Sequence, residues 1–407
     1  MKIRSITYFC NPKYPLAEKV LQKAGKFLAE ARSAYQSAGY EVQTVRLATV
    51  PFPQLFRSAD FSRQTRLLAQ LPKLAEQLGQ AIPAFGILYA SLGPALPDLP
   101  RSYEVLPEAI AAASNIFYGG VMADTKRGLD LAAVRACAEV IVKSAFIEPN
   151  GFANLQFAAL ANVQPGAPFF PAAYHAGKQP AFGIATEAAD LAVDAFANAK
   201  SVNIGRRDLT RAIEKHGRKL AKIAATLNCK FYGVDFSLAP FPDDAHSLGN
   251  AVEKMGIPKI GLHGSLAAAA LLTEAVDRAN FPHTGFSGFM QPVLEDSVLA
   301  QRAAEGTLTI KDALLYSAVC GTGLDTVPLP GDTTAEQLVP LLLDISALAL
   351  RLNKPLTARL MPIPGKQAGD ETNFDFGFFK NSKVMKLDSR ALNTPFDQDE
   401  VLQIRQR

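Results

Sequence analysis

The stretch from 315 to 332 concentrates residue types that can do chemistry. It reads Leu-Tyr-Ser-Ala-Val-Cys-Gly-Thr-Gly-Leu-Asp-Thr-Val-Pro-Leu-Pro-Gly-Asp. A thiol can be a nucleophile or a ligand, carboxylates handle protons or metal ions, and glycines let the backbone approach a bound molecule. We therefore predict a small-molecule site in this stretch, although these residue types do not select one reaction.

The three ionisable residues of this stretch have different interpretations. Cys320 is either a buried thiol that packs a helix end, or a nucleophile or ligand whose thiolate a nearby cation would favour. Asp325 lies in an extended run between Leu324 and Val327, where aspartate is a poor strand residue, so we predict a role as general base or metal ligand. Asp332 is predicted to cap the helix that follows it.

Two further charges interrupt apolar strands. Asp235 stands between Val234 and Phe236, and a buried carboxylate is costly unless it is paired or hydrogen-bonded. It is therefore either part of a structural pair or a site residue near the end of its strand, where parallel sheets bind ligands. Arg359 and the later Lys366 could hold a carboxylate or phosphate together, or Arg359 could neutralise a buried aspartate.

The histidine candidates lie in a loop and at a helix start. His263-Gly264-Ser265 opens a predicted helix where backbone N–H groups and a hydroxyl could meet an anion, although Ser265 as a plain N-cap is the simpler interpretation. His175, in a proline-rich loop, is either a ligand or proton carrier or a histidine hydrogen-bonded within that loop. The candidate metal ligands are His175, Asp325, Asp332 and Glu295.

The elements that must position these residues alternate between strand and helix. This order predicts mostly parallel pairing with helical crossovers, an α/β architecture, in one domain over 1–385 followed by a polar tail over 386–407. The run 152–163 reads equally well as a strand or a buried helix. The predicted strands are 2–9, 40–49, 84–92, 114–122, 230–238, 285–292 and 354–363. The predicted helices are 16–38, 60–80, 104–113, 128–142, 186–199, 206–227, 245–255, 265–279, 293–304, 310–319 and 333–352, and Thr309 is predicted to cap the helix 310–319.

Composition narrows the function classes. The chain has 407 residues, 48% of them hydrophobic, and a formal net charge of +4 without a basic block, so binding to nucleic acid or to a membrane surface has no support. The four cysteines are far apart and are expected to be free thiols in a reducing cytoplasm. No Walker, GxGxxG, GxSxG or HExxH pattern is present, so ATP, NAD, flavin and zinc-peptidase interpretations are unsupported.

Several segments taken together resemble one family. They are Val234 to Pro240, Glu295 and Asp296 ahead of Cys320 to Asp325, Val327 to Thr333, Arg359 to Lys366, and Pro168 to His175. Over roughly 1–385 the chain resembles the domain of unknown function 711 family, also called uncharacterised protein family 0210. The resemblance implies a large β/α barrel similar to that of the pyruvate formate-lyase-like glycyl radical enzymes, with mostly parallel strands in two facing halves. It implies no settled activity.

The radical chemistry of those enzymes is not expected here. Their radical glycine lies in a short Arg-Val-x-Gly-Tyr-like motif near the C-terminus. In this chain the nearest glycines, Gly369 and Gly377, stand in Gln-Ala-Gly-Asp-Glu and Asp-Phe-Gly-Phe-Phe. The barrel is therefore expected without the glycyl radical.

Two hypotheses follow from the sequence. In the first, the protein is a cytoplasmic hydrolase or lyase for a small polar or anionic metabolite, with Asp325 and Asp235 as acid/base or metal-ligating groups and Cys320 as a nucleophile. Arg359 and Lys366, together with His263 and Ser265, would bind the substrate's negative group, and His175 would close the site. In the second, it is a catalytically inert ligand-binding or regulatory protein. Both are compatible with a divalent metal ion and with a homodimer.

Overall fold

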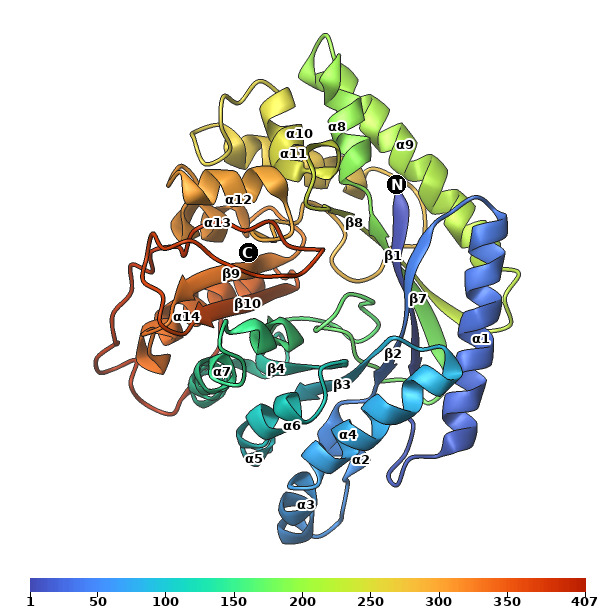
Figure 1. The fold of residues 1–407 in the computed structure, drawn as a ribbon, viewed down its shortest axis with the longest axis vertical. Coiled ribbons are helices and arrows are strands. Elements are labelled where there is room, and N and C mark those ends of the chain that lie inside the picture. Colours follow the sequence, from blue (N-terminus) through green and yellow to red (C-terminus); the bar gives the residue numbers. More distant parts are fainter.

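An eleven-stranded, mostly parallel sheet forms the centre of the structure, a computed structural model that describes residues 1–407 (Figure 1). The strand order is β8-β7-β1-β2-β3-β4-β6-β10-β9, and β5 pairs with both β4 and β11. The mixed α/β architecture predicted from the alternating pattern is confirmed. The strands are β1 (Lys2–Cys10), β2 (Val42–Thr49), β3 (Tyr89–Ala95), β4 (Ile116–Asp124), β5 (Gly128–Asp130), β6 (Phe157–Ala161), β7 (Ala181–Glu187), β8 (Lys230–Ala239), β9 (Gly323–Pro330), β10 (Leu356–Ile363) and β11 (Val401–Leu402).

The helices lie around the outside of the strands (Figure 1). Their apolar stripes face the sheet, as in α14, where Leu338, Leu342, Ile345 and Ala349 are buried as the spacing predicts. None of the helices has the length and apolar surface that a bilayer crossing needs. The helices are α1 (Glu18–Ser37), α2 (Phe52–Leu55), α3 (Phe61–Leu68), α4 (Leu71–Ala81), α5 (Arg101–Glu104), α6 (Leu106–Ala112), α7 (Leu131–Ala145), α8 (Ala189–Ala197), α9 (Val202–Ala224), α10 (Leu248–Lys254), α11 (Ser265–Asp277), α12 (Ser297–Ala304), α13 (Ile310–Tyr316) and α14 (Ala335–Arg351).

The sheet consists of two parallel blocks that run in opposite directions. In one block β1, β2, β3, β4 and β6 are parallel neighbours. In the other, β7 is parallel to β8 and β9 is parallel to β10. The blocks meet in antiparallel pairs, β1 with β7 and β6 with β10. Buried parallel strands read as continuous apolar runs, and all eight residues of β10 are buried.

Regular strand pairing does not close this sheet. β8 and β9 are its two edges and do not pair with each other. Residues 283–292, predicted as a strand over 285–292, form only isolated bridges, Val234 with His283 and Ser237 with Gly288 on one side, and Pro292 with Asp325 on the other. The segment is therefore an irregular connection between the two edges.

Other predicted elements need correction. Thr186 and Glu187, expected to open a helix over 186–199, instead end the buried strand β7. The apolar run after Pro180 is short and has no periodicity of its own, so nothing in the sequence contradicted the longer helix. The predicted helix 60–80 is two helices, α3 and α4, with a proline in the first turn of the second. The ambiguous run 152–163 contains both a 3₁₀ turn over Phe152–Gln156 and the strand β6.

Two predicted helix caps also need correction, and a third is confirmed. Thr334 rather than Asp332 caps α14, in a capping box with Gln337, because the helix begins two residues later than expected. Gly264 occupies the N-cap of α11, and Ser265 is the first helical residue. Thr309 caps α13 as predicted.

The polar end of the chain lies on the first block. β11 pairs antiparallel with β5, Val401 opposite Asp130 and Leu402 opposite Leu129. Arg351 donates a hydrogen bond to the carbonyl of Arg405. The division into a domain over 1–385 and a tail over 386–407 stays a prediction.

Asp235 holds the irregular segment against β8. Its carboxylate accepts hydrogen bonds from the backbone N–H groups of Phe286 at 2.7 Å and Ser287 at 2.8 Å, and from the hydroxyl of Ser237 at 2.7 Å. Gly285 has φ +67°, and a Cβ there would lie 2.0 Å from Oδ2 of Asp235. Burial raises the pKa of Asp235 to about 6 despite these hydrogen bonds. The geometry matches the structural interpretation of this aspartate.

We predict that Asp235→Ala lowers the free energy of unfolding by about 2–4 kcal/mol, because two buried N–H groups lose their acceptor. Urea denaturation at pH 7 measures the change. Asp332→Ala is the matched control, since Asp332 is exposed and caps no helix, and it should shift stability by less than about 0.5 kcal/mol. An Asp235→Ala protein as stable as the wild type would contradict this role.

Candidate functional site

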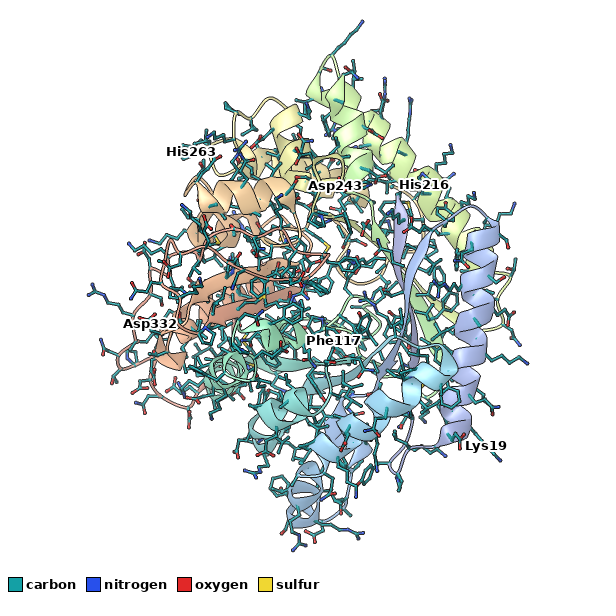
Figure 2. The ribbon with its side chains drawn as sticks, in the orientation of Figure 1. Lys19, Phe117, His216, Asp243, His263 and Asp332 are labelled. Carbon is teal, nitrogen blue, oxygen red and sulfur yellow. The ribbon has the colours of Figure 1, made fainter.

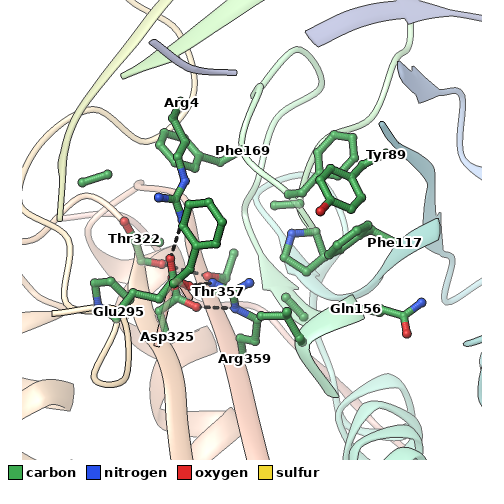
Figure 3. A pocket seen from close by; sticks show the side chains of 18 of the residues that line it. Arg4, Tyr89, Phe117, Gln156, Phe169, Glu295, Thr322, Asp325, Thr357 and Arg359 are labelled. Carbon is green, nitrogen blue, oxygen red and sulfur yellow. Dashed lines mark hydrogen bonds and ion pairs between the residues drawn. The ribbon is translucent and has the colours of Figure 1, made fainter. Parts of the chain in front are cut away.

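A cavity of about 190 Å³ lies between the two blocks (Figure 3). Arg4, Thr44 and Arg46 reach it from β1 and β2, and Asp325 and Arg359 reach it from β9 and β10. Much of the remaining wall is aromatic, including Tyr89, Phe117, Phe152, Phe169, Phe170 and Phe286. The cavity can therefore hold a molecule that combines polar and apolar parts.

Five charged side chains form a continuous series that we call the ion-pair chain. Four of them line the cavity, Arg4, Glu295, Asp325 and Arg359 (Figure 3). Arg4 donates from Nη1 to Glu187 at 2.9 Å and from Nη2 to Glu295 at 2.7 Å. Arg359 donates from Nη2 to Glu295 at 2.8 Å and from Nε to Asp325 at 2.6 Å. The order is Glu187, Arg4, Glu295, Arg359, Asp325, so the chain connects β7 and β1 with β10 and β9.

A β-bulge aims Asp325 at Arg359. In the β9/β10 register Leu324 pairs with Ala358 and Val327 with Leu360, which leaves Asp325 and Thr326 opposite the single residue Arg359. Thr326 has φ +43°, a left-handed conformation that is unfavourable for a β-branched residue. Bulges of this kind often redirect a side chain next to a functional site. The local strain is therefore coupled to the placement of the carboxylate.

Glu295 is fixed by the start of the next helix. Asp296, the N-cap of α12, accepts hydrogen bonds from the N–H groups of Val298 and Leu299 at 3.0 Å. The same carboxylate accepts from the N–H of Leu248 at 2.6 Å, and therefore holds α10 as well. A carboxylate anchored by two helices sets the position of its neighbour Glu295 against the two arginines.

Burial and charge act in opposite directions on Asp325. Burial raises its pKa, the Arg359 charge acts to lower it, the Glu295 charge raises it, and the net shift is upward. The pKa of Arg359 is also raised, because Asp325 and Glu295 outweigh the effect of burial. A carboxyl group with a raised pKa beside a fixed cation suits proton transfer near neutral pH.

Arg46 is a half-buried cation without a carboxylate partner. Its Nε donates to Thr44 Oγ1 at 2.9 Å, and Nη1 and Nη2 donate to no protein group. The guanidinium lies over the rings of Phe170 at 5.0 Å and Tyr89 at 5.8 Å. Burial, followed by the charge of Arg4, lowers its pKa to about 9, so the side chain is still a cation at neutral pH.

The predicted site residues separate into two groups. Asp325, Arg359 and Glu295 come together at the cavity, as described above. Cys320 and Asp235 do not line it. The sulfur of Cys320 is buried and accepts the N–H of Gly323 at 3.2 Å, since the turn after α13 folds back onto it. Cys320 and Asp235 therefore do not share the cavity with Asp325 and Arg359.

The remaining candidates lie away from the cavity. His263 and Asp332 are exposed on the outside of the molecule, whereas Phe117 lies toward the centre (Figure 2). Lys366 does not reach the cavity because it lies in the turn after the end of β10. The carbonyl of Lys366 accepts a hydrogen bond from the N–H of Gly331. Ser265 donates to the carbonyl of Leu262 at 2.7 Å instead of facing a ligand.

His175 interacts with neighbouring residues and does not line the cavity. Its Nδ1 lies 3.3 Å from the hydroxyl of Tyr232 and 3.4 Å from the backbone nitrogen of Gly177, and burial lowers its pKa. No group of three His, Cys, Asp or Glu side chains is close enough to hold a metal ion, so the expected ligands His175, Asp325, Asp332 and Glu295 do not form one cluster. All four cysteines are free.

Sequence reasoning missed Arg4, Arg46 and Glu187. Arg4 and Arg46 occur in strands of mixed polarity, which look like strands with one solvated face. For Arg46 the available signal was the same as for Arg359, a single arginine between apolar neighbours, here Val45-Arg46-Leu47. Arg4, between Ile3 and Ser5, has no such signal. Glu187 was assigned to a helix start and could not be read as the end of a strand.

Comparisons with known proteins identify one family and several similar chains. The family described as Uncharacterised ACR (DUF711) matches residues 1–382. A UPF0210 protein of Pyrobaculum aerophilum is 33% identical over 370 residues, which are 86% of this chain and 79% of the relative. UPF0210 proteins of Acetivibrio thermocellus and Neisseria meningitidis are 28% and 29% identical, over 91% and 84% of this chain and 84% and 79% of the relatives.

We predict that Arg359→Met lowers the free energy of unfolding by about 3–5 kcal/mol at pH 7, because Asp325 is left buried without its cation. Unfolding in urea at pH 7 and pH 5 measures the effect. The deficit should shrink at pH 5, where unpaired carboxylates take up protons more readily. Arg278→Met removes an exposed ion pair with Glu274 and should cost less than about 1 kcal/mol.

For Asp325→Asn we expect a change in stability whose pH dependence has the opposite sign. Because the pKa of Asp325 is raised on folding, the folded protein binds this proton more tightly than the unfolded chain, and its contribution to stability falls as pH rises above about 4. We therefore expect the stability of Asp325→Asn relative to the wild type to increase between pH 4 and pH 8 in urea titrations. Asp332→Asn should show no such trend. A relative stability that decreases with pH would mean that Arg359 dominates and the pKa is lowered.

Proposed function

The chain belongs to the family described as Uncharacterised ACR (DUF711), and we propose that it is an enzyme for a small polar or anionic molecule bound in the interior cavity. The observation that carries this proposal is the contact of Arg359 with both Asp325 and Glu295 at the cavity wall. A structural ion pair needs one carboxylate for one arginine. Here a second carboxylate is buried beside the first, and the pKa of Asp325 is raised.

In this proposal Asp325 is the general acid or base. Its carboxyl group faces the cavity and can exchange a proton with a bound molecule, while Arg359 holds the carboxyl in place and stabilises the negative charge that forms when the proton leaves. Glu295 positions Arg359 and links it to Arg4. Such a unit supports a hydrolase or a lyase. Cys320 has no part in it, since its sulfur does not line the cavity.

The alternative function is ligand binding without turnover. The observation that favours it is that both carboxylates are already bound to an arginine, as in a purely structural network. In this case the cavity would still bind a small molecule. The replacement of Asp325 would change neither the identity of the bound ligand nor its chemical state.

We also propose that the sheet is a barrel of the kind found in the pyruvate formate-lyase-like glycyl radical enzymes. The support is the arrangement in two opposed parallel blocks, together with the isolated bridges of residues 283–292 to both β8 and β9. No glycyl radical is part of the proposal. We further propose a cytoplasmic location, for which the four free thiols give support. A homodimer stays a prediction.

We predict that wild-type protein changes the composition of a mixture of small metabolites, and that Asp325→Asn does so at least about 100-fold more slowly, the typical contribution of a general acid or base. Mass spectrometry of the mixture before and after incubation measures the change. Asp332→Asn, which alters an exposed aspartate, is the control and should match the wild type. Equal turnover by wild type and Asp325→Asn would refute the role of Asp325, and ligand-dependent stabilisation without any turnover would establish the alternative.

A further inference from the structure

The unpaired guanidinium of Arg46 indicates what kind of molecule enters the cavity. A cation that is partly withdrawn from water is costly unless an anion compensates it. Arg4 and Arg359 both have carboxylate partners, whereas Nη1 and Nη2 of Arg46 have none. Because Nε is engaged by Thr44, the two terminal nitrogens form the free edge of the group. This edge matches the two oxygens of a carboxylate.

The charges around Arg46 favour a single negative charge on the ligand. Arg46 lies in the electrostatic range of Arg4, Glu295 and Arg359. The ion-pair chain contains three carboxylates and two guanidinium groups, so it contributes no excess of positive charge. A phosphate dianion would meet one arginine without a carboxylate partner and, beside it, an ion-pair chain that contains one carboxylate more than it has guanidinium groups. A carboxylate monoanion would be balanced by Arg46 alone.

The surroundings of Arg46 favour an aromatic or similarly bulky apolar group next to that carboxylate. Tyr89 and Phe170 flank the guanidinium, and Phe117 lies against both rings, with centroids 5.6 Å from Tyr89 and 5.4 Å from Phe170. Rings in such a wall offer edge and face contacts to another ring. A cavity of about 190 Å³ is close in size to apolar cavities that accept benzene, and smaller than those of drug-sized ligands.

We propose that the ligand is an arylalkyl monocarboxylate, with its carboxylate on the free edge of Arg46 and its ring against Phe117, Phe170 and Tyr89. This inference rests on the proposed binding function of the cavity and names its ligand class. Arg46 is thereby a specificity-determining residue rather than part of the ion-pair chain.

Calorimetric titration of the full chain with a set of simple probes tests the proposal. The probes are phenylacetate, 3-phenylpropionate, acetate, phenylacetamide and inorganic phosphate. We expect the two aryl acids to bind at least about 10-fold more tightly than acetate, which lacks the ring, and phenylacetamide, which lacks the charge. Phosphate binding that exceeds that of both aryl acids, or binding of none of the probes, would overturn the proposal.

Variants assign the binding to Arg46. Arg46→Gln should weaken phenylacetate binding about 100-fold, as expected for the loss of a charge-assisted bidentate pair. It should not reduce the thermal midpoint of the free protein, because no protein carboxylate loses a partner. Arg63→Gln, at an exposed position on α3, is the control and should leave binding unchanged. Equal binding by Arg46→Gln and wild type would refute the assignment, and Phe170→Leu should selectively reduce the preference for aryl acids over acetate.

The same titration separates this inference from the proposed function. Asp325→Asn should retain phenylacetate binding within about threefold, because Arg46 and the aromatic wall are unchanged. Aryl acids that bind without any turnover would leave the ligand class standing and remove the acid/base role. Turnover of a molecule without a carboxylate, with no aryl-acid binding, would leave the acid/base role standing and remove the ligand class.

Discussion

The arrangement of the strands depends on the burial of five charges in one series. A carboxylate or guanidinium inside a protein costs several kcal/mol unless partners and hydrogen bonds compensate it. Each arginine of the ion-pair chain bridges two carboxylates, so β1, β7, β9 and β10 can take up only positions that keep these contacts. The ion-pair chain therefore connects β1 and β7 with β9 and β10, although the edge strands β8 and β9 do not pair with each other.

The same series leaves the charges at the cavity wall unevenly balanced. Three carboxylates against two arginines leave one carboxylate incompletely balanced, and it is Asp325, at the end of the series, whose pKa is raised. The group lies on a bulge with a left-handed threonine beside it, a conformation that costs stability. Strain and incomplete pairing at one position are typical of sites where function limits stability.

Part of this site was accessible from the sequence. Asp325 and Arg359 each interrupt an apolar strand, and the cost of burying a charge makes such residues stand out. Arg4 was not accessible, because its partner Glu295 is 291 residues away and nothing local to β1 distinguishes an arginine facing a cavity from one facing water. Asp235 gives the same sequence signal as Asp325, but its carboxylate holds a backbone segment. The alternation of strands and helices was readable, whereas the isolated bridges of 283–292 were not, since they depend on both neighbouring strands.

The position of the cavity follows from the opposed directions of the two blocks. In open parallel sheets, ligands bind beyond the carboxyl ends of the strands. Here Tyr89 and Phe117 stand at the beginning of β3 and β4, and Asp325 stands near the beginning of β9. Strands that run in opposite directions can bring their first halves together only near the middle of the sheet. The site is therefore enclosed between the blocks. Because β2, β3 and β4 contribute Arg46, Tyr89 and Phe117 while β9 and β10 contribute Asp325 and Arg359, neither half of the chain contains it alone.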